Sequence, residues 1–142
     1  MTFTNRLVVF GKNAHTFLYR RFDTRIFRTI KGQPILLLTV AGRTSGTPIT
    51  TPVVYLRDGA SYVVAGSNGG MKPEPQWFRN LRAASAANIE VDALRTEVTV
   101  RVAEGAEYER LWAARVRTAP FFEGYASKSG RVIPLAVLTP TA

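Results

Sequence analysis

The sequence predicts a single α+β domain in which six mostly antiparallel strands close towards a small barrel, with helices at its periphery. Short apolar runs are separated by glycine- and proline-rich turn signals, and other segments have helical periodicity. The 142 residues, 46% of them hydrophobic, suffice for one core but not for two. We divide the chain into an N-terminal amphipathic helical segment, residues 1–31, and a barrel domain, residues 32–142.

The segment from Thr2 to Ile30 has the periodicity of a basic amphipathic helix. Arginines and lysines lie between apolar residues spaced three or four apart, which are Phe3, Leu7, Phe10, Ala14, Phe17 and Leu18. Two interpretations stay open: a helix packed on the domain with a solvated outer face, or a helix attached peripherally to anionic lipid. His15 stands alone, without a cluster of ligand residues, so no metal site is expected there.

Three strands follow a break at Gly32 to Pro34. The run Ile35 to Val40 is continuously apolar, as in a strand buried on both faces. A second strand is expected from about Thr50 to Arg57, and the pair Asp58-Gly59 predicts a type I′ hairpin into a third strand, Ser61 to Ala65.

The remaining elements alternate between helices and strands. Prolines precede a short helix whose Trp77 and Leu81 share a face, and regular alternation marks the strand that ends at Val102. Pro134 inside the last strand indicates an edge position or a bulge. The predicted elements are a helix Gln76 to Ala83, strands Ile89 to Ala93 and Thr96 to Val102, a helix from about Ala106 to Thr118, and a strand Val132 to Leu138.

Composition narrows the class of protein. The chain has no cysteine, which excludes disulfides and thiolate chemistry, and its formal charge of +9 favours a polyanionic partner. Basic residues form no stripe or recognition motif, so nucleic acid is not the expected partner. No segment approaches the roughly 20 apolar residues of a membrane-spanning helix, and no secretory leader is evident. We expect a cytoplasmic protein, with association at the inner face of the membrane as an open alternative.

Common catalytic motifs are missing. The sequence contains no GxGxxG after a strand, no GxxxxGK[ST], no HExxH and no carboxylate pair in a plausible loop. A Ser-His-Asp triad would have to recruit His15 from the N-terminal segment. Acid–base chemistry must therefore rest on hydroxyls, on backbone groups or on a cofactor.

Three segments are candidates for a binding site. Gly42 to Gly46 offers successive backbone N–H groups, two hydroxyls and a guanidinium suited to phosphate or carboxylate oxygens, although a simple hairpin turn uses the same residue types. Gly66 to Gly70 lets the backbone approach a flat ligand closely, or is only a flexible loop. The third candidate is an aromatic set that walls an apolar pocket or belongs to the core: Trp77, Phe121, Phe122 and Tyr125.

The order and spacing of five segments resemble the deazaflavin-dependent nitroreductase family, a branch of the split-barrel flavin and deazaflavin oxidoreductases of actinobacteria. The segments are LLLTVAGRTSGTP, TPVVYLRDG, YVVAGSNGGMKPEPQWFRNLRA, ERLW and GRVIPLAVLTP. The resemblance implies a split β-barrel that binds coenzyme F-420, an 8-hydroxy-5-deazaflavin with a phosphate and a polyglutamate tail, in preference to FMN. It further implies hydride transfer to an electron-poor small molecule such as a quinone, an enone or a nitroaromatic.

Site residues follow from the same resemblance. Ser67 and Tyr125 are the expected catalytic residues, and the acceptor pocket is expected at Val54, Phe122 and Tyr125. The residues expected at the coenzyme are Arg43, Thr44, Ser45, Gly46, Pro48, Pro52, Ala65, Ser67, Asn68, Gly69, Gly70, Trp77 and Asn80.

The chain departs from the family pattern at several positions. Familiar members carry basic residues at the positions of Thr44, Ile49 and Asn68, and tyrosines at the positions of Val54, Ala119 and Phe122. Arg43, Lys72, Lys128 and Arg131 are the cations that replace the missing charge in part. The alternatives are a non-catalytic or differently specific split-barrel binder of a fatty acid, flavin or tetrapyrrole, and a basic membrane-peripheral or nucleic-acid-binding module. A monomer and a homodimer are both compatible with the sequence.

Overall fold

The computed structural model describes residues 29–141. The predicted N-terminal amphipathic helix and His15 lie outside the described residues, except that Thr29–Ile30 form a short strand, β1, where the helix was expected to continue. Within residues 29–141 no helix is long and apolar enough to cross a bilayer.

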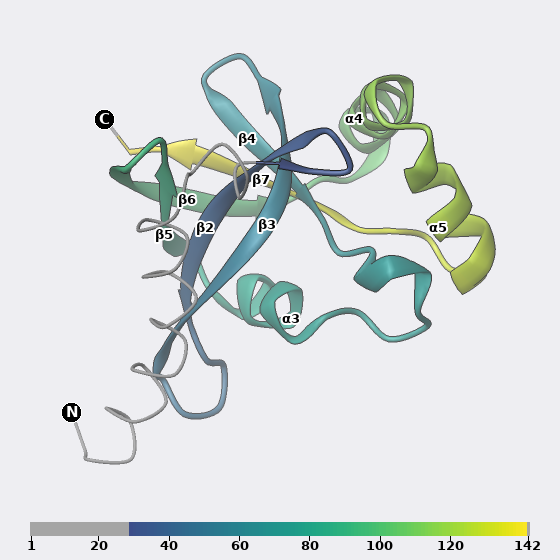
Figure 1. The fold of residues 1–142 in the computed structure, drawn as a ribbon. Helices are drawn as coiled ribbons and strands as arrows, with labels where there is room; N and C mark the ends of the chain where they lie inside the picture. Colours follow the sequence, from purple (N-terminus) through teal and green to yellow (C-terminus); the bar gives the residue numbers. More distant parts are fainter. Residues whose placement is uncertain (1–28, 142) are drawn as a thin grey trace.

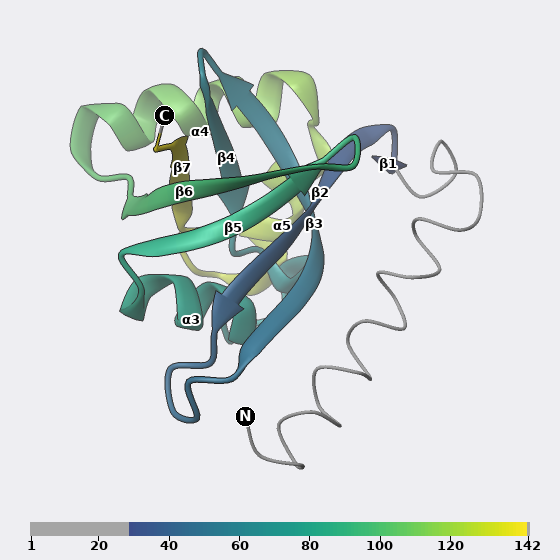
Figure 2. The same cartoon turned by 90° about the vertical axis from the view of Figure 1, so that its left-hand side faces the viewer.

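The described chain forms a closed antiparallel β-barrel, which confirms the predicted fold class. Neighbouring strands follow the order β1-β2-β3-β4-β7-β6-β5, and pairing of Leu38 with Ile89 between β2 and β5 closes the barrel. Figures 1 and 2 show the strands curving round into the barrel. The strands are β2 (Gln33–Ala41), β3 (Pro48–Asp58), β4 (Ser61–Ala65), β5 (Ala86–Val91), β6 (Leu94–Val102) and β7 (Leu135–Pro140).

Tight turns set the register of three hairpins. Asp58 pairs with Ser61, and only the first residue of the two-residue turn between them, Gly59, has a positive φ, at 60°. That pattern fits type II′, so the predicted type I′ turn is wrong. In the β5–β6 turn both Asp92 and Ala93 have positive φ, which ends β5 at Val91 and corrects the predicted strand to Ala93.

In the described part of the chain, three α-helices and a short 3₁₀ helix, η1 (Asn68–Gly70), lie around the barrel (Figure 1). Helix α3 (Gln76–Ala83) has the predicted bounds, and α4 (Gly105–Thr118) begins one residue before its predicted start. Helix α5 (Phe121–Ser129) is not predicted by the sequence, in which the aromatic segment is expected to lead directly into the last strand. Gly130 ends α5 in the left-handed conformation, with φ 68°, as is common at helix C-termini.

The last strand differs from the prediction in position as well as in length. Strand β7 lies between β4 and β6, so it is internal and not an edge strand. It begins at Leu135, after Pro134, and therefore no proline interrupts its hydrogen-bonded ladder to either neighbour before its final residue. Pro134 instead accepts the Gly66 N–H at its carbonyl, at 2.9 Å, and joins the start of β7 to the end of β4.

Candidate active site

The β2–β3 turn is held by its own hydrogen bonds. Gly42 N–H donates to the Thr47 carbonyl at 2.8 Å, Gly46 N–H donates to the Gly42 carbonyl at 2.8 Å, and Thr47 N–H donates to Ser45 Oγ at 3.1 Å. Within residues 29–141, the amides of Thr44 and Ser45 and the Thr44 hydroxyl make no hydrogen bond. Both residues are exposed. The turn therefore presents two successive N–H donors to solvent, the arrangement that binds anionic oxygens.

Arg43 connects this turn to α3. Its backbone N–H and its Nη1 both donate to Asn80 Oδ1, at 3.1 Å and 2.8 Å, and its Nη2 donates to Gln76 Oε1 at 2.7 Å. Asn80 is 4% exposed, so the acceptor is fixed in the protein interior. Two neutral amides thus orient the guanidinium without neutralising its charge, which stays available to an anion. Arg43 and Asn80, which were both expected at the coenzyme, thus contact each other directly.

The loop after β4 approaches α3 closely at Gly66. A Cβ at this position would lie 2.8 Å from Phe78 Cγ and 3.0 Å from Pro134 Cγ, so only glycine fits. Ser67 begins η1 and is half-buried, and its hydroxyl has no hydrogen bond to another described residue. Asn68, with φ 50°, donates from Nδ2 to the Pro73 carbonyl at 3.0 Å, so its amide stabilises the loop itself.

Arg131 holds the same loop from the other side, a role that the sequence did not reveal. Its Nη2 donates to the carbonyls of Gly66 at 3.0 Å and Ser67 at 3.2 Å, and its Nε donates to Met71 at 3.2 Å. Nη2 also lies within hydrogen-bond distance of the Pro73 carbonyl, at 3.3 Å. The guanidinium is therefore engaged in loop structure, and partial replacement of a coenzyme-binding cation by Arg131 stays a prediction.

The loop packs on α5, which brings Tyr125 to the site. A Cβ at Gly70 would lie 3.3 Å from Tyr125 Cα and 3.0 Å from Lys128 Cδ. Tyr125 makes edge contacts with Phe121 and Phe122, with ring centroids 5.5 Å and 5.6 Å apart. The predicted catalytic residues thus belong to two adjoining elements, the β4–η1 segment and α5.

The predicted acceptor residues differ in exposure. Val54 on β3 is half-buried and packs against the cluster that contains Phe122 and Tyr125. Phe122 is only 4% exposed, so it backs the cluster and offers little surface to a ligand. Behind it lies Arg115, 1% exposed, whose guanidinium carbon is 4.8 Å from the centre of the Phe122 ring. Burial lowers the pKa of Arg115.

The other predicted coenzyme residues surround these contacts. Trp77 lies on α3, half-buried, with its ring centroid 5.6 Å from that of Phe78. Pro48 and Pro52 are exposed on β3, opposite Ala41 and Leu37 of β2. The exposed Gly69 has no heavy atom within 4 Å of a notional Cβ, whereas Ala65 is 8% exposed at the end of β4.

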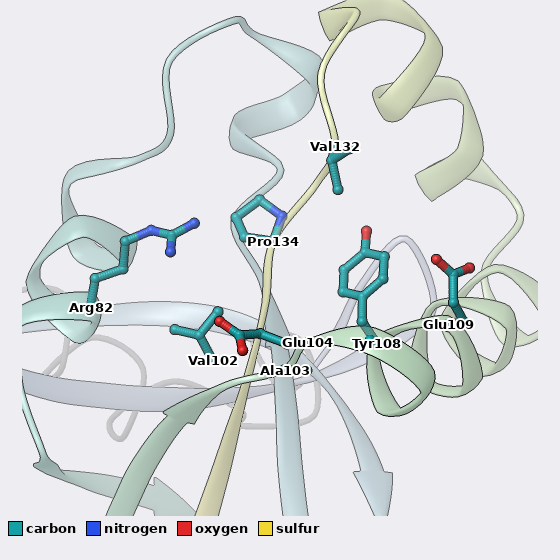
Figure 3. A pocket seen from close by; sticks show the side chains of 9 residues that line it. Arg82, Val102, Ala103, Glu104, Tyr108, Glu109, Val132 and Pro134 are labelled. Atoms are coloured by element: carbon teal, nitrogen blue, oxygen red, sulfur yellow. The ribbon is translucent and has the colours of Figure 1, made fainter.

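A separate cavity of about 420 Å³ lies between the end of α3, the β6–α4 junction and the segment before β7 (Figure 3). No predicted site residue lines it. Glu104 and Glu109 stand at its rim, and Arg82 there is already paired with Glu74 at 2.6 Å. Since carboxylates repel phosphates and carboxylates, this cavity does not suit the coenzyme tail. Tyr108 donates its hydroxyl to the Ile133 carbonyl at 2.6 Å within the same wall, and burial raises its pKa.

Residues 29–141 contain no cluster of His, Cys, Asp or Glu arranged to hold a metal ion.

Comparison with known proteins finds relatives that match most of the chain. An F420H(2)-dependent quinone reductase of Mycobacterium tuberculosis is 36% identical over 129 residues, which cover 88% of this chain and 87% of the relative. A solved structure described as an F420-H2-dependent reductase has a TM-score of 0.68 and 28% identity, covering 74% of this chain and 93% of that one. Another, described as a domain-swapped dimer, has a TM-score of 0.68 and 26% identity over 87% and 98% of the two chains.

The match to a family extends over almost the whole chain. Residues 12–140 match the family described as F420H(2)-dependent quinone reductase. This confirms the resemblance to deazaflavin-dependent oxidoreductases, with coenzyme F-420 as the cofactor of the family, and replaces the broader nitroreductase description with one that specifies quinones. The chain belongs to the F420H(2)-dependent quinone reductase family.

Proposed function

We propose that this protein transfers a hydride from reduced coenzyme F-420 to a quinone, with the β2–β3 turn binding the anionic part of the coenzyme and α5 bordering the acceptor. The observation that carries the assignment of residues is a continuous line of contacts. Arg43 contacts α3 through Asn80, the Phe78 ring of α3 packs on Gly66, and the loop from Gly66 packs on Tyr125 through Gly70.

The residues of the turn fit a phosphorylated, carboxylated ligand. The amides of Thr44 and Ser45 make no hydrogen bond within the described chain. The Arg43 guanidinium lies at the same turn, and neutral acceptors fix its orientation. Charge-assisted hydrogen bonds of this kind are about twice as strong as neutral ones. Amide donors are also independent of side-chain type, which supports coenzyme binding without a basic residue at position 44.

The ring of the coenzyme would lie against the segment from Ala65 to Gly70, where Gly69 has open space beside its Cα. The coenzyme supplies the hydride when bound, and the protein must orient the acceptor, exclude water and deliver a proton. Ser67 offers a half-buried hydroxyl with no protein partner among residues 29–141. Tyr125 offers a phenol beside the same loop, and Val54 an apolar surface. We assign the proton donor to Tyr125 and acceptor orientation to Ser67.

Two measurements test this function. The first is titration of the purified protein with oxidised coenzyme F-420 and separately with FMN; selective binding of the deazaflavin is expected. The second is oxidation of the reduced coenzyme by a water-soluble benzoquinone. Tyr125→Phe should lower kcat on the order of 10²-fold, the usual scale of general acid catalysis, and leave coenzyme affinity within about twofold. Indifference to both flavins, together with a co-purified lipid or tetrapyrrole, would show that the protein is a ligand carrier instead.

Assembly and location stay predictions. A homodimer is supported by the relative described as a domain-swapped dimer, and sedimentation velocity distinguishes it from a monomer. Peripheral attachment to the inner face of the membrane would depend on the basic N-terminal segment, outside the described residues. Co-sedimentation with anionic vesicles, compared with neutral ones, tests that attachment.

A further inference from the structure

The β1–β2 turn places a lysine against the proposed proton donor. Lys31 Nζ lies 2.6 Å from the Tyr125 hydroxyl oxygen and 5.0 Å from the centres of both the Phe121 and Tyr125 rings. The two hydrogen-bonded residues are 94 positions apart in the sequence, so the closed barrel brings them together. Neither the sequence patterns nor the family resemblance had pointed to Lys31.

The direction of this hydrogen bond is fixed by chemistry. An ammonium group has three donors and no acceptor, so the Tyr125 oxygen must accept from Lys31. The phenol hydrogen then remains available to another acceptor, and no residue within 29–141 accepts it. The lysine thereby occupies one side of the phenol oxygen and turns its O–H towards another partner.

The backbone of the turn is unusual at the same residue. Lys31 has φ 52° and Gly32 has φ 78°, the two positive values of a type I′ turn. Asn-Gly is the preferred pair for such a turn, and a lysine at its first position costs conformational energy. Strained backbone of this kind persists where surrounding contacts over-determine it, often beside functional groups.

A second contact holds the hairpin over the α4–α5 corner. Gln33 Nε2 donates to the Thr118 carbonyl at 3.4 Å, and the buried Arg115 donates from Nη2 to Gln33 Oε1. The Arg115 Nη2 also donates to the Thr118 hydroxyl at 3.1 Å. Gln33, two residues beyond Lys31, therefore anchors the hairpin. This anchoring holds the Lys31 ammonium beside Tyr125.

We propose that Lys31 is a positioning residue that orients the Tyr125 hydroxyl for proton donation to the reduced acceptor and then restores its proton. The proposal rests on the function proposed above. A quinone becomes a hydroquinone by taking up one hydride and one proton. The Tyr125 O–H bond breaks as its proton passes to the acceptor oxygen, an N–H bond of Lys31 breaks to reprotonate the phenol oxygen, and water returns a proton to the amine.

Lys31→Asn is the sharpest test because asparagine suits the turn and lacks the ammonium. We expect an unfolding midpoint no lower than that of the parent, unchanged coenzyme affinity, and a fall in kcat for benzoquinone of about tenfold, which is less than the roughly 10²–10⁴-fold that a general acid itself contributes because Tyr125 stays in place. Lys31→Arg should recover at least about a third of the lost activity but not all of it, since a guanidinium keeps a cationic donor that orients the phenol and does not give up a proton. Arg95→Met, which removes one exposed charge from the distant β5–β6 hairpin, should retain parental kcat.

Two further readouts separate orientation from mere structural support. In a double-mutant cycle, adding Lys31→Asn to Tyr125→Phe should cause no further loss of kcat, because the lysine acts through the phenol. In the coenzyme-free protein labelled with ¹³C-tyrosine, the Cζ resonance of Tyr125 should shift in Lys31→Asn and not in Arg95→Met. An additive loss in the cycle, or an unmoved resonance, would overturn the proposal.

The outcomes also distinguish the two levels of the argument. A parent protein that reduces no quinone overturns the proposed function and the proton-donor role with it. Quinone reduction that Lys31→Asn performs as fast as the parent overturns the role of Lys31 alone.

Discussion

Replacing Arg131 with methionine tests the strongest structural contact of the site. The side chain has three N–H hydrogens on Nε and Nη2, directed at four carbonyls in the segment from Gly66 to Pro73. A hydrogen bond to a charged group contributes about 1.5–3 kcal/mol, so three give an upper bound of about 4.5–9 kcal/mol. The hydrogen bonds to the Met71 and Pro73 carbonyls are exposed to solvent, and Nη1 is buried without a partner among the described residues. Both features reduce the net contribution of Arg131 to the free energy of unfolding.

We therefore expect Arg131→Met to destabilise the fold by about 2–4 kcal/mol. At about 2–4 °C per kcal/mol for a domain of this size, the unfolding midpoint should fall by about 10 °C in differential scanning calorimetry. Coenzyme affinity should fall about tenfold, because binding must then order the Gly66 to Gly70 loop. Arg131→Lys should give an intermediate loss, since an ammonium cannot span several carbonyls as a planar guanidinium does.

Arg117→Met is the matched control, because it removes an exposed arginine from the last turn of α4. It should shift the midpoint by no more than about 2 °C, as surface substitutions usually change stability by less than about 0.5 kcal/mol. Equal midpoints and equal coenzyme affinities for the Arg117 and Arg131 variants would refute the conclusion that Arg131 organises the loop.

Further predictions concern binding, packing and pH. Arg43→Ala should weaken coenzyme binding about tenfold in fluorescence titration, the loss of roughly one charge-assisted hydrogen bond; unaltered affinity would place the tail elsewhere. Gly66→Ala should cost about 1–3 kcal/mol through its clash with Phe78, whereas Gly124→Ala, in open space on α5, should stabilise by up to about 1 kcal/mol; urea denaturation compares them. The hydrogen bonds from Arg82 lower the pKa of Glu74, so the ion pair stabilises the fold above pH 4.5, the ordinary pKa of the carboxyl, and this stabilisation is lost as the pH falls below that value. In acid titrations followed by circular dichroism, Glu74→Gln should make stability depend less on pH over this range.

Elements with unambiguous local signals could be predicted from the sequence. The α3 bounds follow from prolines before an amphipathic run, and β4 follows from a glycine turn before a short apolar run. Helix α5 was missed because Gly124 and a cluster of aromatic residues obscure its helical periodicity. Its stability comes from packing against the cluster around Phe122, and local sequence does not encode such contacts reliably.

The candidate site was predictable where a position is defined by its backbone, and less so where a long side chain reaches across the fold. Gly66 and Gly70 are required by close approach to α3 and α5, whereas the sequence had suggested close approach of a flat ligand. Arg115 was not expected inside, because an arginine on a helix is usually exposed. Arg131 and Lys31 act on residues about 60 and 94 positions away, so only the assembled barrel defines their roles.

The excess of positive charge has a different meaning in the structure from the one that composition suggested. Arg43 is oriented by two amides of α3, Arg131 is engaged by loop carbonyls, Arg115 is buried against Phe122, and Lys31 contacts Tyr125. These cations contribute to the structure of the ligand-free site. Of the four, only Arg43 lies beside backbone amides that make no hydrogen bond within the described chain. Anion affinity should then depend on the geometry of one turn more than on the number of basic residues. On the proposed function, that dependence would let this chain bind an anionic coenzyme with Thr44, Ile49 and Asn68 at the positions where basic residues were expected from the resemblance.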